Sequence, residues 1–360
     1  MKTLGIIVEY NPFHFGHANH LAKSKELTGC DTTIAVMSGN FVQRGEPAIC
    51  DKWRRTQMAL EAGVDLVIEL PLYYATGAAG YFARGAVSLL DKSGIVDCMC
   101  FGSEWADIDA LKNSAKSLLQ EDEAFKNRLK ENLSTGMSYP AARAKASLVN
   151  LPDTANNVLG VEYIKSLMQL ESNIEPYTIL RAPVSAKDIR AELRSFNFNI
   201  ADLDNLSTIF HYILRTHEDL QGFVDVSEGL DNRLRNFAKG NMPISDIIAK
   251  SKTKRYTYLR LQRAVLHIIL GITKNNLSAY EATGGPQYIR VLGFKKNHVE
   301  LLKRLEHYSK LPIVTNLKNA KLSDLATQML EEEVKSSKVY SLAFTNNAYF
   351  NEYAMPMKII

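Results

Sequence analysis

The stretch that decides the fold is Gly5-Ile6-Ile7-Val8-Glu9-Tyr10-Asn11-Pro12-Phe13-His14-Phe15-Gly16-His17-Ala18-Asn19-His20-Leu21. Ile6 to Val8 is a short apolar, β-branched run, which predicts a buried parallel strand, and Asn11-Pro12 ends it before a helical pattern begins near Phe15. The sequence therefore predicts a strand that leads directly into the N-terminus of a helix. Such a junction favours a phosphate, because free backbone N–H groups and the positive end of the helix dipole meet there.

Two imidazoles stand at this junction. His14 and His17 are three residues apart and share one helical face, with the small Gly16 between them. The pattern His-x-Gly-His resembles the motif of the nucleotidyltransferase superfamily, whose members transfer AMP from ATP, and in which the glycine lets a nucleotide approach the backbone. We therefore predict that His14 and His17 are catalytic residues that contact the phosphates of ATP.

The same histidines have a second interpretation. His14, His17 and His20 follow an i, i+3, i+6 spacing, which would also suit a metal site. Zinc sites usually add a thiolate or a carboxylate at a recognisable spacing, and none is obvious nearby. The sequence therefore predicts no metal site built from side chains, and a structural role remains the alternative for His20.

Composition indicates a globular protein of two domains. A chain of 360 residues with 46% hydrophobic residues can bury a sizeable core, and a net charge of +4 does not by itself imply nucleic acid. The four cysteines, Cys30, Cys50, Cys98 and Cys100, show no C-x-x-C spacing, which predicts free thiols in a reducing compartment. We expect a cytoplasmic protein with no membrane partner, because no signal peptide or bilayer-length apolar run is apparent.

Strands and helices alternate in the first half of the sequence. The expected strands are Ile6–Val8, Thr32–Met37, Leu66–Leu70, Val96–Phe101 and Tyr177–Leu180; the expected helices are Phe15–Leu27, Asp51–Ala62, Ala78–Leu90, 108–133 and one that begins at Asn156. This alternation predicts an α/β, Rossmann-like parallel sheet with helices on both faces and ligands at the carboxyl ends of the strands. We assign residues 1–195 to this domain and residues 196–360 to a mainly α-helical domain.

Polar segments follow two of these strands. Ser38–Ala48 is a loop with two glycines, and such loops often carry function. Gly102 follows another strand, where a glycine lets a base or ribose lie against the backbone. An ordinary connection and a plain turn glycine are the alternative interpretations.

A second helix N-terminus follows the last expected strand. Ser185 and Asp188 have capping-box spacing, which is an adequate structural explanation. In a nucleotidyltransferase the same segment would face the ATP phosphates, and a nearby cation would neutralise the charge that develops on pyrophosphate. The candidate residues of this second signature are Ser185, Lys187 and Arg190.

Positive charge is concentrated in the segment 251–267. From Tyr258 onward the segment resolves into an apolar stripe and a separate face with Arg260, Arg263 and His267. Basic residues interleaved with tyrosines predict an RNA-backbone surface, and a solvated helix face is the alternative. The residues expected to bind RNA are Lys252, Lys254, Arg255, Tyr256, Arg260 and Arg263.

Over almost its whole length the chain resembles the bacterial tRNA(Met) cytidine acetate ligases. The segments that carry the resemblance are Gly5–His20, Ser38–Ala48, Gly63–Pro71, Phe101–Glu104, Asn156–Tyr163 and Lys252–Tyr256. The resemblance implies that ATP activates free acetate as acetyl-adenylate, which then acetylates N4 of the wobble cytidine of elongator tRNA(Met). It also implies Mg²⁺ that is held mostly by the triphosphate.

The resemblance also implies which residues bind ATP. They are Ile7, Val8, Glu9, Tyr10, Asn11, Pro12, Phe13, His14, Phe15, Gly16, His17, Ala18, Asn19, His20, Gly102, Asn156, Asn157 and Arg181. Asn156 is preferred over its neighbour. Lys187 and Asp188 stand where the superfamily commonly has small hydroxyl or apolar residues, which weakens a specific role for Lys187. No acetate-binding residue, general base or oligomeric state follows from the sequence.

Two functions of other classes stay open. An adenylyltransferase that joins AMP to a small phosphorylated acceptor predicts a dinucleotide product and no use for the basic second half. A non-catalytic RNA-binding protein predicts tRNA binding without ATP turnover. Transfer of labelled acetate into tRNA separates both from the ligase.

Overall fold

The computed structural model describes residues 1–120, 123–137, 139–146, 154–183, 186–196, 198–227, 229–346 and 349–360. Five strands run parallel in its central sheet. They are β1 (Thr3–Val8), β2 (Thr32–Ser38), β5 (Leu66–Leu70), β6 (Cys98–Ser103) and β7 (Glu175–Leu180). All five were expected from the sequence within a few residues of their bounds, and the α/β fold is confirmed.

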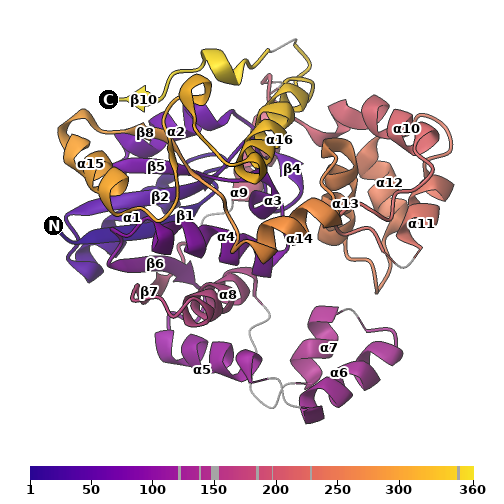
Figure 1. Cartoon of the computed structure of the whole chain (residues 1–360). Helices are drawn as coiled ribbons and strands as arrows, with labels where there is room; N and C mark the ends of the chain where they lie inside the picture. The colour runs from indigo at the N-terminus through magenta and orange to yellow at the C-terminus, as the bar shows by residue number, and fades with distance from the viewer. Residues whose placement is uncertain are drawn as a thin grey trace.

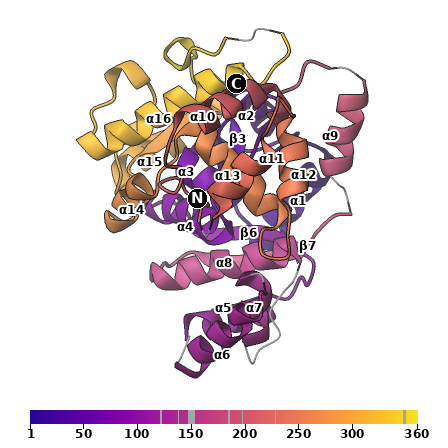
Figure 2. The same ribbon diagram turned by 90° about the vertical axis from the view of Figure 1, so that its right-hand side faces the viewer.

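Helices cover both faces of this sheet (Figure 1). Those of the first half are α1 (Phe15–Thr28), α2 (Lys52–Glu61), α3 (Leu72–Ala75), α4 (Ala79–Lys92), α5 (Ile108–Leu119), α6 (Glu123–Ser134), α7 (Tyr139–Ala146), α8 (Ala155–Gln169) and α9 (Ala186–Ser195). The helix expected over 108–133 is therefore two helices, α5 and α6. They lie with α7 at the lower edge of the molecule, below α8 (Figure 2).

The side chains of β2 show why the sheet needs cover on both faces. Ile34 and Val36 pack into the core cluster that contains residues of α4, whereas Ala35 and Met37 pack into the cluster that contains residues of α1 and α2. Successive strand residues point to opposite faces, so a strand that is apolar throughout must be buried on both. This two-sided burial positions the carboxyl ends of β1, β6 and β7 next to one another.

The second half of the chain is helical only in part. A group of helices lies to one side of the sheet: α10 (Ser207–Thr216), α11 (Leu230–Phe237), α12 (Ile244–Ser251) and α13 (Tyr258–Leu270), followed by α14 (Lys274–Ala282). The chain then returns to the sheet as β8 (Ile289–Phe294), which pairs antiparallel with β5. The later elements are α15 (Val299–Tyr308), β9 (Ile313–Val314), α16 (Asp324–Ser341) and β10 (Lys358–Ile359).

The second half is mainly helical, as expected, but β8 and β9 within it and β10 at its end were not predicted from the sequence. The sheet has eight strands, in the order β10-β8-β5-β2-β1-β6-β7 with β9 beside β8. The division into domains at residue 195 stays a prediction. Its second part contributes strands to the same sheet as the first.

Five buried charged side chains form ion pairs that hold β8 and the C-terminal segment against the rest of the fold. Lys52 Nζ lies 2.6 Å from Glu69 Oε1, 3.1 Å from Glu352 Oε1 and 3.7 Å from Glu333 Oε1. Arg290 of β8 lies 2.9 Å from Glu69 Oε2 and 2.5 Å from Glu352 Oε2. The pKa of Glu333 is raised, mainly because burial penalises its charged form and Glu69 adds a second negative charge. These ion pairs join α2, β5, β8, α16 and the C-terminal segment.

The helix α13 packs directly on the loop after β2. That loop forms a short hairpin of β3 (Phe41–Val42) and β4 (Glu46–Pro47), with Gly45 at φ +81° between them. A Cβ on Gly45 would lie 2.6 Å from the backbone N of Arg263, so only a glycine permits this approach. The hairpin and the helical group are in direct backbone contact here.

His267 was expected on the basic face of this helix, and that expectation is wrong. The side chain is fully buried, with Nε2 3.1 Å from Thr76 O and Nδ1 3.2 Å from Val224 O. Burial lowers its pKa, so the ring is held neutral. His267 therefore joins α13 to the region after α3 and takes no part in a basic surface.

Candidate active site

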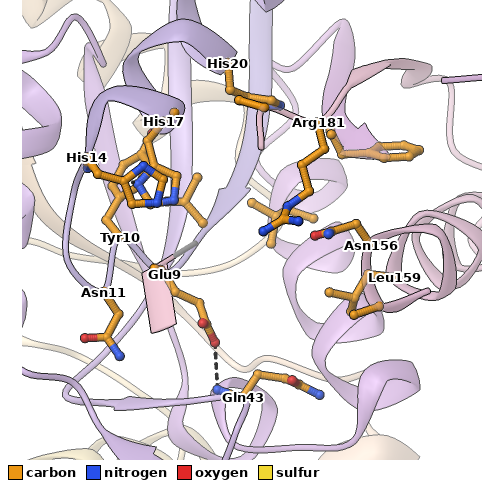
Figure 3. Close-up of a pocket in the computed structure, with 18 of the residues that line it drawn as sticks. Glu9, Tyr10, Asn11, His14, His17, His20, Gln43, Asn156, Leu159 and Arg181 are labelled. Carbon is orange, nitrogen blue, oxygen red and sulfur yellow. Dashed lines mark hydrogen bonds between the residues drawn. The ribbon is translucent and has the colours of Figure 1, made fainter. Parts of the chain in front are cut away.

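A pocket of about 360 Å³ opens at the carboxyl ends of β1, β6 and β7 (Figure 3). Its walls come from the segment after β1, the start of α1, the hairpin loop, the start of α8 and the start of α9. Among the residues predicted for ATP and for the second signature, those that line it are Ile7, Val8, Glu9, Tyr10, Asn11, His14, Gly16, His17, Asn19, His20, Gly102, Asn156, Arg181, Lys187 and Arg190. The expected position of a ligand site at the strand ends thus coincides with a pocket.

His14 and His17 meet face to face at the start of α1. Their rings stack with centroids 3.7 Å apart and an interplanar angle of 15°. The backbone N–H of His14 donates to His17 Nδ1 at 3.3 Å. Because Nδ1 accepts, the hydrogen of the neutral His17 ring is on Nε2.

The three histidines at the start of α1, His14, His17 and His20, are held neutral. Burial lowers the pKa of His17 to about 3, and His14, His20 and Arg181 lower it further by charge repulsion. Burial also lowers the pKa of His20 to about 4, and the pKa of His14 is lowered by burial and Arg181. The imidazoles therefore offer N–H donors and not positive charges to the pocket.

Arg181 provides the positive charge on the opposite wall. It follows β7 and extends between His20 and Asn156 (Figure 3). Gly102, on the neighbouring strand β6, presents bare backbone beside it. A Cβ there would lie 3.7 Å from His20 Cδ2 and 3.8 Å from Arg181 Cα, so a small side chain would fit the empty pocket but would cover the exposed backbone.

The two neighbouring asparagines at the start of α8 differ in position. Asn157 is fully buried, and its Oδ1 accepts the backbone N–H groups of Glu104 and Trp105 at 2.9 and 3.1 Å. Asn156 lines the pocket and donates from Nδ2 to Glu104 Oε1 at 2.7 Å. Asn157 thus orders the turn after β6, whereas the amide of Asn156 is available at the pocket wall.

Arg190 of the second signature donates a hydrogen bond to the segment between β1 and α1. Its Nη1 donates to Asn11 O at 2.8 Å, and its Nη2 lies 3.5 Å from Glu46 Oε1. The side chain is 7% exposed and lines the pocket. Lys187 also lines the pocket, while Ser185 and its expected capping box lie outside the described residues.

Several predicted ATP residues are not on the pocket wall. Phe13 packs against Tyr10 and His17 with ring centroids at 4.7 and 5.7 Å, so it supports the histidine from behind. Phe15 is 80% exposed to solvent. The others that do not line the pocket are Pro12, Ala18 and Asn157.

Other lining residues were not predicted individually. Gln43 and Arg44 belong to the polar loop that the sequence marked only as a whole, and Leu259 comes from α13, more than 200 residues later. The apolar wall, which could not be recognised locally, consists of Phe82, Phe101, Ala155, Leu159, Tyr163, Ile179, Leu180, Ala182 and Ala186. The contribution of Leu259 shows that the helical group closes one side of the pocket.

The residues expected to bind RNA divide into two sets. Lys252, Lys254 and Arg255 are exposed in the segment between α12 and α13. Tyr256 is only 8% exposed and is covered by the Arg260 guanidinium, 5.3 Å from its ring centroid, so its ring is less open for stacking than expected.

Two basic side chains of α13 have partners within the protein. Arg260 donates to Ser227 Oγ at 2.7 Å, and Arg263 pairs with Asp225 at 3.0 Å. The side chain of Arg263 is 12% exposed. The exposed positive charge of this segment therefore lies mainly before α13.

Comparison with known proteins agrees with this geometry. A family model described as HIGH nucleotidyl transferase matches residues 1–198 and 183–354. The chain is 42% identical to the tRNA(Met) cytidine acetate ligase of Thermoanaerobacter sp. (strain X514), with 97% of each protein covered. It belongs to the tRNA(Met) cytidine acetate ligase family. The tRNA(Met) cytidine acetate ligase of Clostridium perfringens (strain ATCC 13124) is 40% identical over 95% of each chain.

Solved structures give the same assignment. A crystal structure of Thermotoga maritima TmcAL bound with alpha-thio ATP has a TM-score of 0.93 and 33% identity to this chain, and it covers 100% of this chain and 99% of its own. The apo structure of the same Thermotoga protein has a TM-score of 0.94. The sheet, the helical group and their relative arrangement are therefore shared with the Thermotoga protein.

Proposed function

We propose that this chain is an ATP-dependent ligase that acetylates N4 of the wobble cytidine of elongator tRNA(Met), with acetyl-adenylate as the intermediate. The observation that carries the proposal is one pocket with two kinds of wall. His14, His17 and Arg181 lie at the strand ends, and Leu259 lies at the start of α13, directly after the exposed basic segment. A nucleotide site thus adjoins a surface suited to an RNA backbone, and a tRNA substrate implies work in the cytoplasm.

The first step is the attack of an acetate oxygen on the α-phosphate of ATP, which releases pyrophosphate. We propose that His14 and His17 stabilise the phosphate oxygens through N–H hydrogen bonds, since both rings are neutral before ATP binds. Arg181 supplies a positive charge opposite them. No covalent enzyme intermediate is needed.

The site offers little to a protein-bound metal. In the described part of the chain no group of three His, Cys, Asp or Glu side chains could hold a metal ion. The described pocket wall has one acidic side chain, Glu9. These donors do not form a Mg²⁺ site of their own, and we propose that Mg²⁺ enters with ATP and is bound mostly by the triphosphate oxygens.

The test is transfer of label. Purified protein is incubated with ATP, labelled acetate and total tRNA, and label is expected in tRNA only when ATP is present. His17→Ala should abolish acetate-dependent release of pyrophosphate, because it removes an N–H group that donates a hydrogen bond to the phosphate. Formation of a dinucleotide, or binding of tRNA without ATP turnover, would show one of the other two functions. Full pyrophosphate release by the variant would refute the role of His17.

A further inference from the structure

Glu9 is among the residues that the resemblance implies for ATP binding, but its charge differs from that of the other ionic side chains of the pocket. It is the sole acidic side chain that the described residues contribute to the pocket wall, whose basic side chains are three imidazoles and the cations Arg44, Arg181, Lys187 and Arg190. A carboxylate repels a triphosphate at short range. Glu9 therefore has little to contribute to ATP binding, and its side chain calls for another partner.

The carboxylate is held in a fixed position. Glu9 directly follows β1, and its Oε1 accepts the backbone N–H of Gln43 at 2.8 Å. Among the described residues no hydrogen bond reaches Oε2, and the side chain lies between the stacked imidazoles and Gln43 in the pocket (Figure 3). One oxygen thus fixes the orientation while the other is open to a ligand.

This side of the pocket is the side on which RNA would arrive. Gly45 of the hairpin loop contacts the backbone of Arg263, and Glu46 accepts a hydrogen bond from Gln262 at 3.4 Å. Leu259 lies one turn earlier on the same helix and lines the pocket. Glu9 and the hairpin loop that holds its carboxylate therefore lie on the side of the pocket that α13 closes, next to the basic segment.

The groups around Glu9 change the pKa of its carboxyl group in both directions. Burial raises its pKa most strongly, and Glu46 also raises it, whereas the Gln43 N–H, Arg44 and Arg190 lower it. Tyr163 faces Glu9 as well and stays a neutral phenol, because burial and the Glu9 charge raise its pKa. The outcome is a carboxyl group with a raised pKa, which is a better proton acceptor than a solvated glutamate.

The second half-reaction needs such an acceptor. The cytosine amine is a weak nucleophile because its lone pair is delocalised into the ring, and it must lose a proton as the new bond forms. We infer that Glu9 is the general base of acetyl transfer, an assignment that rests on the proposed function. N4 attacks the acetyl carbonyl carbon, the bond from that carbon to the phosphate oxygen breaks, AMP leaves with the electron pair, and the N4 proton passes to Glu9 Oε2.

The experiment separates the two half-reactions in Glu9→Gln. Acetate-dependent exchange of pyrophosphate into ATP reports acetyl-adenylate formation, and single-turnover labelling of tRNA(Met) reports transfer. The variant should keep most of the exchange and lose transfer by about 10²- to 10⁴-fold, the usual contribution of a general base. Wild-type transfer should rise with pH as Glu9 loses its proton, and the variant should lack this rise. Glu26→Gln, an exposed carboxylate on α1, is the matched control.

The outcomes are distinguishable. Equal loss of exchange and transfer would place Glu9 in ATP or Mg²⁺ binding and overturn the inference, as would normal transfer by the variant. If Glu9→Gln does not fold, the wild-type pH profile decides, because transfer that does not rise with pH excludes a base of this kind. Absence of both half-reactions in the wild type would refute the proposed function itself.

Discussion

Gly102 leaves backbone atoms open to the pocket because it has no side chain. Its backbone lies exposed between His20 and Arg181, and a Cβ would make only ordinary contacts of 3.7–3.8 Å in the empty pocket. We therefore expect Gly102→Ala to fold normally but to weaken ATP binding by roughly 1–2 kcal/mol, about five- to thirtyfold in Kd, because the methyl group keeps the nucleotide away from the strand. Titration calorimetry measures this change.

A matched control is Gly222→Ala. A Cβ on Gly222 would have nothing within 4 Å of it, so this substitution should alter neither ATP affinity nor the thermal midpoint. If Gly102→Ala bound ATP like the wild type, close approach of the ligand to β6 would be disproved. A large drop in its thermal midpoint would instead show that Gly102 serves packing.

The candidate residues of the pocket were easier to predict from the sequence than their protonation and burial. The motif around Gly16 identified His14 and His17 because the chemistry is local. Their neutrality was not predictable, since it comes from burial and from Arg181, which is more than 160 residues away. The same limit applied to Asn156 and Asn157, because only the fold shows which amide is buried beneath the turn after β6.

At the scale of elements, the contact between the β3–β4 hairpin and α13 is the critical junction. Gly45 has φ +81°, and a Cβ would lie within 2.6–2.8 Å of the backbone of Gln262 and Arg263. Gly45→Ala should lower the free energy of unfolding by roughly 1–3 kcal/mol, from backbone strain plus this clash. It should also reduce tRNA acetylation more than acetyl-adenylate formation, because it displaces α13 from the pocket.

The comparison variant is Gly29→Ala. Gly29 also has a positive φ, +62°, but nothing lies within 4 Å of its Cβ position. Gly29→Ala should therefore lower the free energy of unfolding by the backbone strain alone, as measured by denaturant unfolding. Acetyl-adenylate formation and acetyl transfer should both stay at the wild-type level in the two assays. Equal effects of the two substitutions on acetyl transfer would argue that the contact between the hairpin and α13 has no role in this step.

Elements with strong local patterns were predicted well, and elements defined by distant partners were not. β2 and β5 are apolar runs between helices, so periodicity sufficed. β8 is equally apolar, but it pairs with β5 across more than 200 residues and lies within a helical context, so its sequence alone did not reveal it. Similarly, amphipathicity separated His267 from the apolar stripe of α13 but could not show that Thr76 and Val224 cover that face.

Considered as a whole molecule, the chain uses about its last fifth to complete the central sheet. The first half forms the parallel strands, the helical group adds Leu259 to the pocket wall, and β8 to β10 then extend the sheet beyond β5. The buried charges at this closure are net negative if all three carboxylates are ionised. A raised pKa of Glu333 is the expected consequence, because one proton relieves the imbalance.

Removal of one cation should therefore destabilise the entire fold. Arg290 is 3% exposed and pairs with both Glu69 and Glu352, so Arg290→Met leaves Lys52 alone among three buried carboxylates. We expect a loss of roughly 3–5 kcal/mol in the free energy of unfolding at neutral pH, measured by denaturant titration. Arg84→Met, which breaks the half-exposed pair with Glu281, should cost less than about 1 kcal/mol.

The pH dependence of this loss tests its electrostatic origin. Without Arg290 the folded-state pKa values of the carboxylates rise above their unfolded values, so the folded variant binds more protons than the unfolded chain. Its stability relative to the wild type should therefore recover as pH falls from about 8 to 5. A loss that does not change with pH would mean that Arg290 acts through packing on Trp53, whose ring lies 5.4 Å from the guanidinium, and not through its charge.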